Sequence, residues 1–206
     1  MDKLPEIFGF KAEVPLADGI GGEGVELFDP RADDEFRERA RLVQRLRGGF
    51  TFEAPRPIAF FPGTFDPFTL SHKAIVRTIR DRGFEVLLAI DEFSWSKRTQ
   101  PYRIRRRIAA MSVADEFHVQ IFPEDFPVNI ANPDDLHRLS QLFPDQELYI
   151  VAGSDVVANA SCYKAPPRPW SIHGMNHVIF RRAGEKPLPK KLPITGQVLH
   201  LQLPPH

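Results

Sequence analysis

The residues that could do chemistry gather in one segment, Pro62-Gly63-Thr64-Phe65-Asp66-Pro67-Phe68-Thr69-Leu70-Ser71-His72. Thr69 can donate its hydroxyl hydrogen, and His72, one helical turn further on, can donate a ring N–H to a phosphate oxygen in either protonation state. Gly63 has no Cβ, so the backbone there can approach a ligand closely. A helix that begins near Ser71 would add unpaired N–H groups with partial positive charge. These residues predict a phosphate-binding site.

The elements that must position this segment alternate between apolar strands and amphipathic helices from residue 57 onward. Strands alternating with helices favour right-handed crossovers and a mainly parallel sheet covered on both faces. We therefore predict an α/β, Rossmann-like, doubly wound fold, with the segment at the carboxyl end of its first strand, where ligands usually bind. The expected strands are 58–61, 84–90, 117–122, 148–151, 177–180 and 198–203, and the expected helices are 71–82, 102–115, 133–143 and 154–160.

The N-terminal part of the chain differs from the rest. Residues 30–47 predict a helix, with Asp29 as its cap and Pro30 in its first position. A short segment with two prolines, Thr51 to Pro57, separates that helix from the alternating region. We therefore expect an N-terminal helical extension over residues 1–50 and one domain over residues 57–206.

Composition excludes several classes of function. The 27 basic and 27 acidic residues balance, so the charge gives no reason to expect nucleic acid as a partner. No run approaches the roughly 20 apolar residues that span a membrane. The single cysteine, Cys162, excludes an intramolecular disulfide and fits a reducing, cytoplasmic location. The histidines show no metal-ligand spacing, so we expect no metal held by the protein itself.

Gly63-Thr64-Phe65-Asp66-Pro67, followed by Thr69 and His72, resembles the signature of the HxGH/TxGH nucleotidyltransferase superfamily. The resemblance implies that His72 and Thr69 are catalytic and hold the triphosphate of ATP, with His72 stabilising the transition state. Ser71 stands where the family has glycine, which adds a side chain where backbone and phosphate pass closely.

Two further segments carry the resemblance. Ser96-Lys97-Arg98 is similar to the family's basic loop near the ATP phosphates, and Arg107 falls where the next helix often carries arginine. Gly153-Ser154-Asp155 is similar to the family's turn near the nucleotide and acceptor, although Asp155 could instead cap the next helix. The implied ATP-binding residues are Gly63, Thr64, Phe65, Lys97, Arg107, Gly153 and Asp155.

The end of the sequence favours one branch of the superfamily. Nicotinate/nicotinamide mononucleotide adenylyltransferases have an aromatic residue near the base and then a strand ending in Arg-Pro-Gly, which Phe180-Arg181-Arg182-Ala183-Gly184 resembles. The aromatic would be Tyr163 or Trp170, for which packing is the alternative reading. The implied acceptor-binding residues are Ser154, Tyr163, Trp170 and Arg181.

The resemblance implies an enzyme that moves AMP from ATP, bound with Mg²⁺, to a pyridine mononucleotide and releases pyrophosphate, a step of NAD biosynthesis. A phosphopantetheine adenylyltransferase-like enzyme is one alternative, supported by the threonine of the signature. A non-catalytic nucleotide-binding remnant is another, motivated by Ser71, by residues 1–50 and by an expected lack of the family's late I-S-S-T-x-x-R segment, which would begin about where the sequence ends at Leu203-Pro204-Pro205-His206. Whether the chain forms a homo-oligomer is left open.

Overall fold

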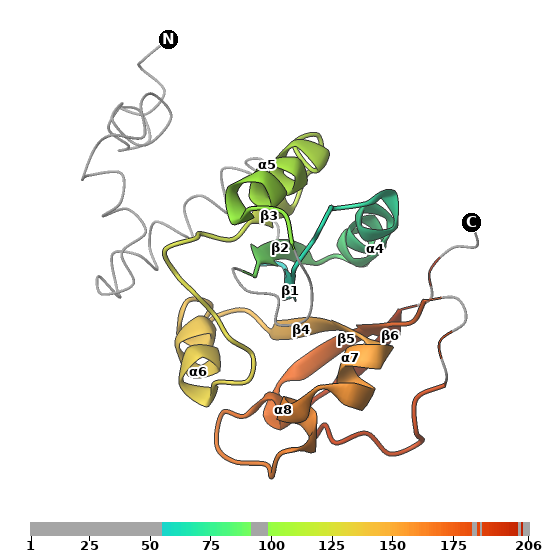
Figure 1. The fold of residues 1–206 in the computed structure, drawn as a ribbon. Coiled ribbons are helices and arrows are strands. Elements are labelled where there is room, and N and C mark those ends of the chain that lie inside the picture. The colour runs from blue at the N-terminus through green and yellow to red at the C-terminus, as the bar shows by residue number, and fades with distance from the viewer. Residues whose placement is uncertain (1–54, 92–98, 183–184, 186, 202, 204–206) are drawn as a thin grey trace.

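A computed structural model describes residues 55–91, 99–182, 185, 187–201 and 203; the predicted helix over 30–47 and Lys97 lie outside these residues. Six strands form one sheet in the order β3-β2-β1-β4-β5-β6, and every neighbouring pair is parallel (Figure 1). This confirms the predicted fold class. The strands are β1 (Ile58–Gly63), β2 (Glu85–Ile90), β3 (Val119–Ile121), β4 (Leu148–Gly153), β5 (Asn176–Phe180) and β6 (Val198–Leu201).

The helices are α4 (Leu70–Asp81), α5 (Tyr102–Ser112), α6 (Pro133–Gln141), α7 (Ser154–Asn159) and α8 (Ser161–Lys164), with a 3₁₀ turn at Ile172–Gly174. The predicted helix over 154–160 ends earlier, because Ala160 is extended (φ −67°, ψ 139°) and separates α7 from α8. The predicted strand over 117–122 is shorter, because His118 lies in the left-handed region at φ 59°. Within the described residues, no helix combines the length and apolarity needed to cross a bilayer.

Side chains of the sheet divide into two cores. In β1, Ala59 and Phe61 belong to one core with residues of α4 and α5, whereas Ile58 and Phe60 belong to the other with residues of α6, α7 and α8. Successive strand residues point to opposite faces, so this division follows from a strand that is apolar at every position. Figure 1 shows the two helix groups on opposite sides of the sheet. We call these sides the α4 face and the α6 face.

The connections run in opposite directions on the two sides of β1. From β1 the chain passes to β2 and then β3, whereas β4, β5 and β6 extend the sheet from the other edge of β1. The gap between β1 and β4 is therefore the topological switch point, where open α/β sheets bind ligands beyond the carboxyl ends of their strands.

Candidate active site

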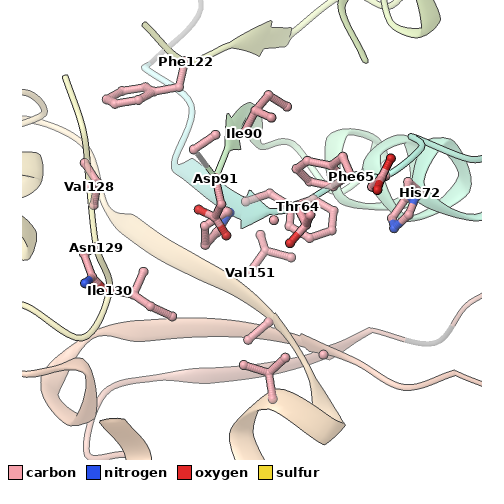
Figure 2. Close-up of a pocket in the computed structure, with 18 of the residues that line it drawn as sticks. Thr64, Phe65, His72, Ile90, Asp91, Phe122, Val128, Asn129, Ile130 and Val151 are labelled. Atoms are coloured by element: carbon pink, nitrogen blue, oxygen red, sulfur yellow. The ribbon is translucent and has the colours of Figure 1, made fainter. Parts of the chain in front are cut away.

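A cleft of about 1490 Å³ opens at the carboxyl ends of the strands, around this switch point (Figure 2). The ends of β1, β2, β4 and β5 line it, together with the start of α4 and a loop over residues 122–131. Pockets for one small molecule usually measure about 300–1,000 Å³. The cleft is therefore large enough to hold two substrates side by side.

His72 and Thr69 both line the cleft and bond to each other as a capping box at the start of α4. The Thr69 backbone N–H donates to His72 Nδ1 (3.0 Å), and the His72 backbone N–H donates to Thr69 Oγ1 (3.4 Å). Because Nδ1 accepts a hydrogen bond, the proton of the neutral ring is on Nε2. Burial, helped by the charge of Arg182, lowers the pKa of His72. The ring is thus a neutral N–H donor at neutral pH.

Gly63, Thr64 and Phe65 line the cleft where the sequence predicts a nucleotide contact. Phe65 has φ 46°, in the left-handed region, and its ring packs edge-on against Phe61 and His72 (centroids 5.2 Å apart in each pair). A Cβ on Gly63 would lie 3.0 Å from that ring. The glycine therefore makes room for Phe65, and the contact of these residues with ATP stays a prediction.

Gly153 and Asp155 also line the cleft, from the end of β4 and the first turn of α7. A Cβ on Gly153 would lie 2.6 Å from Asp155 Oδ1, so the glycine is required for the carboxylate to lie there. Ser154, between them, is a correction. Its buried hydroxyl donates to Glu185 (2.5 Å) and does not line the cleft, so it is not placed to bind an acceptor.

Arg182, rather than the predicted Arg181, lines the cleft. Val178 and Phe180 belong to the core of the α4 face, and Arg182 continues their alternation beyond the end of β5. Its backbone N–H donates to Glu185 (3.1 Å), and its charge acts on His72. Arg181 is exposed and lies outside the cleft.

The two candidate aromatic residues are also corrected, because neither lines the cleft. Tyr163 is 3% exposed, and its hydroxyl lies 3.0 Å from Nε2 of the buried His177 in the core of the α6 face. Trp170 is 47% exposed and stacks on His137, with ring centroids 4.2 Å apart. Both side chains pack, as the alternative reading of the sequence has it.

Arg107 is exposed and does not line the cleft, whereas Arg103 does. The two residues share a helix face, but four residues of α-helix carry Arg107 about 6 Å further from the end of α5 that faces the cleft. Arg103 is therefore the arginine of α5 whose place along the helix brings it to the cleft, and the contact of Arg107 with ATP stays a prediction.

The sequence did not predict a role for Arg105, which is almost fully buried beside the cleft, with 1% of its surface exposed. Its guanidinium donates to the backbone carbonyls of Gln100 (2.8 Å), Thr64 (2.6 Å) and Asp91 (2.9 Å). These carbonyls belong to the chain before α5, the loop after β1 and the end of β2. Arg105 thereby ties together three segments around the cleft. The sequence shows it only as one of several arginines on a helix.

Asp91, directly after β2, was missed as well. The carboxylate lines the cleft and has no hydrogen-bond donor among the residues that the structure describes. Burial raises the pKa of Asp91 to about 6, and the positive charge of Arg105 opposes that rise. No motif in the sequence marks this residue. The available signal is its place at the end of an apolar strand.

A family of known proteins resembles this chain in sequence, and solved structures resemble it in fold. The family model described as Cytidylyltransferase-like matches residues 60–187, more than half of the chain. The chain belongs to the cytidylyltransferase-like family. This confirms the nucleotidyltransferase superfamily predicted from the sequence, and it makes the chain a nucleotidyltransferase. No curated protein matches the sequence.

Two solved structures of Plasmodium falciparum nicotinic acid mononucleotide adenylyltransferase share the fold of this cytidylyltransferase-like chain. One, complexed with NaAD, has a TM-score of 0.56, and the other, complexed with APC, has a TM-score of 0.54. In both cases the sequence identity is 16%, and the match covers 71% of this chain and 75% of the other. At this identity the likeness establishes the fold alone.

The cytidylyltransferase-like cleft has two chemically different sides. On the α4 face lie His72 and Arg182, an N–H donor and a cation. On the α6 face lie apolar side chains and several carboxylates, among them Asp91 and Asp155, and Figure 2 shows Asp91 directed toward the segment that carries Val128, Asn129 and Ile130. The first side suits phosphate, and the second suits an uncharged planar ring.

Among the described residues, no three His, Cys, Asp or Glu side chains gather closely enough to hold a metal ion.

Proposed function

We propose that this chain transfers AMP from ATP to a pyridine mononucleotide and releases pyrophosphate, a step of NAD biosynthesis. The observation that carries the proposal is His72, whose capping bond fixes Nε2–H as its remaining donor beside Arg182. The P. falciparum enzyme whose fold is shared is a nicotinic acid mononucleotide adenylyltransferase and has been solved with NaAD, which supports the choice of acceptor.

The ATP phosphates would lie at the start of α4. The backbone N–H groups of Leu70 and Ser71 occupy the first two helical positions and have no partner within the helix. They form the partial positive end of the helix dipole, and His72 and Arg182 add an N–H donor and a full charge. The Ser71 side chain is exposed and does not line the cleft, so its replacement of glycine leaves this space open.

The reaction requires little from the protein beyond positioning and electrostatics. A phosphate oxygen of the acceptor attacks the α-phosphorus of ATP, and a new P–O bond forms. The bond from the α-phosphorus to the bridging oxygen breaks, and pyrophosphate leaves with the electron pair. A phosphate monoester is ionised at neutral pH, so no protein base is needed. His72 would donate to the oxygens on which charge develops, and Mg²⁺ would arrive as part of the ATP substrate.

The two remaining parts of the substrates would occupy different halves of the cleft. The turn at Gly153 and Asp155, which the sequence predicts to bind ATP, would hold its adenosine part. Since Tyr163, Trp170 and Arg181 do not line the cleft, the acceptor ring needs another wall. The 122–131 loop offers one, because Phe122, Val128 and Ile130 line the cleft and belong to the apolar core of the α6 face.

The test is the initial rate of pyrophosphate release with ATP and Mg²⁺, offering nicotinamide mononucleotide, nicotinate mononucleotide and phosphopantetheine separately. Turnover of a mononucleotide is expected, with a loss of about 100- to 1,000-fold in His72→Ala, as for removal of one transition-state donor. His200→Ala is the matched control, because His200 is exposed on β6 and lies outside the cleft. Turnover of phosphopantetheine alone would identify a phosphopantetheine adenylyltransferase-like enzyme. No pyrophosphate release with any of the three acceptors would contradict the proposal.

A further inference from the structure

Asp91 lines the cleft, and the proposed reaction gives it no role. Along β2, Leu88 and Ile90 belong to the core of the α4 face and Ala89 to that of the α6 face. Asp91 continues this alternation onto the α6 face, opposite the side that carries His72. In Figure 2, Ile90 points toward Phe65, whereas Asp91 points into the open space in front of the 128–130 segment.

The wall opposite Asp91 supplies no free cation among the described residues. Arg106 donates to the Phe122 carbonyl (2.9 Å) and lies 3.9 Å from Glu124, and Arg138 lies 3.6 Å from Asp135. Arg105 is committed to three carbonyls, as described above. A negatively charged group placed between Asp91 and this wall would therefore meet a carboxylate on one side and arginines that are already paired on the other, whereas Arg103 lines the cleft from the first turn of α5.

The apolar residues around Asp91 define the shape of the ligand group that would fit beside it. Phe122, Val128 and Ile130 can cover the faces of a planar ring, while Asp91 can only accept hydrogen bonds when ionised. A carboxylate that is partly removed from water gains from a ligand N–H donor and is penalised by a ligand anion. The site thus discriminates by charge between rings of the same shape.

We propose that Asp91 is a specificity-determining residue that selects an acceptor ring bearing a neutral hydrogen-bond donor, such as a carboxamide, over a ring bearing a carboxylate. This rests on the proposed function, since it places the acceptor ring in this half of the cleft. Its direct consequence is a preference for nicotinamide mononucleotide over nicotinate mononucleotide, two acceptors that differ only in this group.

The experiment compares kcat/KM for the two mononucleotides in the full chain and in Asp91→Asn. The unchanged protein should favour the amide at least tenfold at neutral pH. Asp91→Asn should reduce that ratio at least tenfold, mainly through a lower KM for the nicotinate acceptor, because an asparagine amide can donate to a carboxylate. Asp134→Asn is the control and should leave the ratio unchanged, because Asp134 is exposed at the start of α6 and lies outside the cleft.

Two further measurements separate the ways in which the inference could fail. Calorimetric binding of each mononucleotide to both proteins reads the discrimination without turnover, so loss of the transfer activity alone would overturn only the proposed function. Replacing ATP by ITP tests whether Asp91 instead receives the adenine amino group. The inference is wrong if Asp91→Asn changes the ATP to ITP ratio and leaves the acceptor ratio alone. It is also wrong if the unchanged protein binds the nicotinate acceptor as tightly as the amide.

Discussion

At the scale of single residues, the hydrogen bonds of each histidine decide its role. His72 uses Nδ1 to cap α4, so its remaining N–H serves the cleft. His177 has both ring nitrogens engaged in the core: Nδ1 lies 2.7 Å from the Met175 carbonyl, and Nε2 lies 3.0 Å from the Tyr163 hydroxyl. The first ring has a donor left for a ligand, and the second has none.

Tyr163→Phe tests whether Tyr163 belongs to the core rather than to the acceptor site. Nδ1 of His177 must carry the ring proton, because its partner is the Met175 carbonyl, so Nε2 accepts from the Tyr163 hydroxyl. Removing that hydroxyl leaves the buried Nε2 without a hydrogen-bond donor. The free energy of unfolding should fall by about 1–3 kcal/mol. Urea unfolding measures this change, and the acceptor KM should not move. A raised KM for the acceptor with an unchanged free energy of unfolding would show that Tyr163 belongs to the acceptor site.

The site residues that could be predicted are those whose geometry is fixed by residues close to them in the sequence. Thr69 and His72 lie three positions apart at a helix start, so one local motif fixes their geometry. Arg181 and Tyr163 were misplaced because their direction depends on strand alternation and on packing against distant residues. Asp91 was missed because its significance arises from the loop that faces it, more than thirty positions later in the chain.

At the scale of elements, α5 shows how packing overrides a simple periodic pattern. Ile104 and Met111 are apolar but 46% and 69% exposed, whereas Arg105 and Ala109 are buried. The strands were easier to predict, because parallel strands covered on both faces are apolar at nearly every position. Strand and helix ends depend on single backbone conformations, such as those of His118 and Ala160, and therefore escaped prediction.

Arg105→Lys tests the role of α5 in holding the walls of the cleft. Lysine keeps the charge but lacks the planar guanidinium that reaches three carbonyls at once. We expect a loss of about 2–4 kcal/mol in unfolding free energy, because buried carbonyls and a charge lose partners. The KM for ATP should rise as well. Arg107→Lys, exposed on the same helix, is the control, and an equal effect there would contradict the assignment.

At the scale of the whole molecule, the buried His177 and the partly buried Asp91 give stability opposite dependences on pH. Burial lowers the pKa of His177 to about 4, so its stabilisation is complete above its ordinary pKa of 6.5 and is lost as the pH falls toward 4. Burial raises the pKa of Asp91 from 3.8 to about 6, so its stabilisation is complete below 3.8 and is lost as the pH rises through 6. The two effects oppose each other over nearly the same range.

Asp91→Asn should therefore change the pH dependence of stability in a defined direction. At about 1.36 kcal/mol per pKa unit, the ionised carboxylate costs roughly 3 kcal/mol above pH 6 and nothing when protonated. Relative to the unchanged protein, the variant should gain about that much stability between pH 4 and pH 7. Denaturant unfolding at both pH values measures the difference. A difference that does not vary with pH would contradict the raised pKa of Asp91.

The central claim is that the cleft moves the AMP part of ATP to a mononucleotide. The most direct measurement is a single-turnover reaction with ATP radiolabelled at the α-phosphate, with excess protein and nicotinamide or nicotinate mononucleotide. We predict that the label appears in a dinucleotide with one pyrophosphate released per turnover, and that His72→Ala slows its appearance. Label recovered in ADP or in free AMP, with no labelled dinucleotide, would contradict AMP transfer and leave a cleft that binds nucleotides for another purpose.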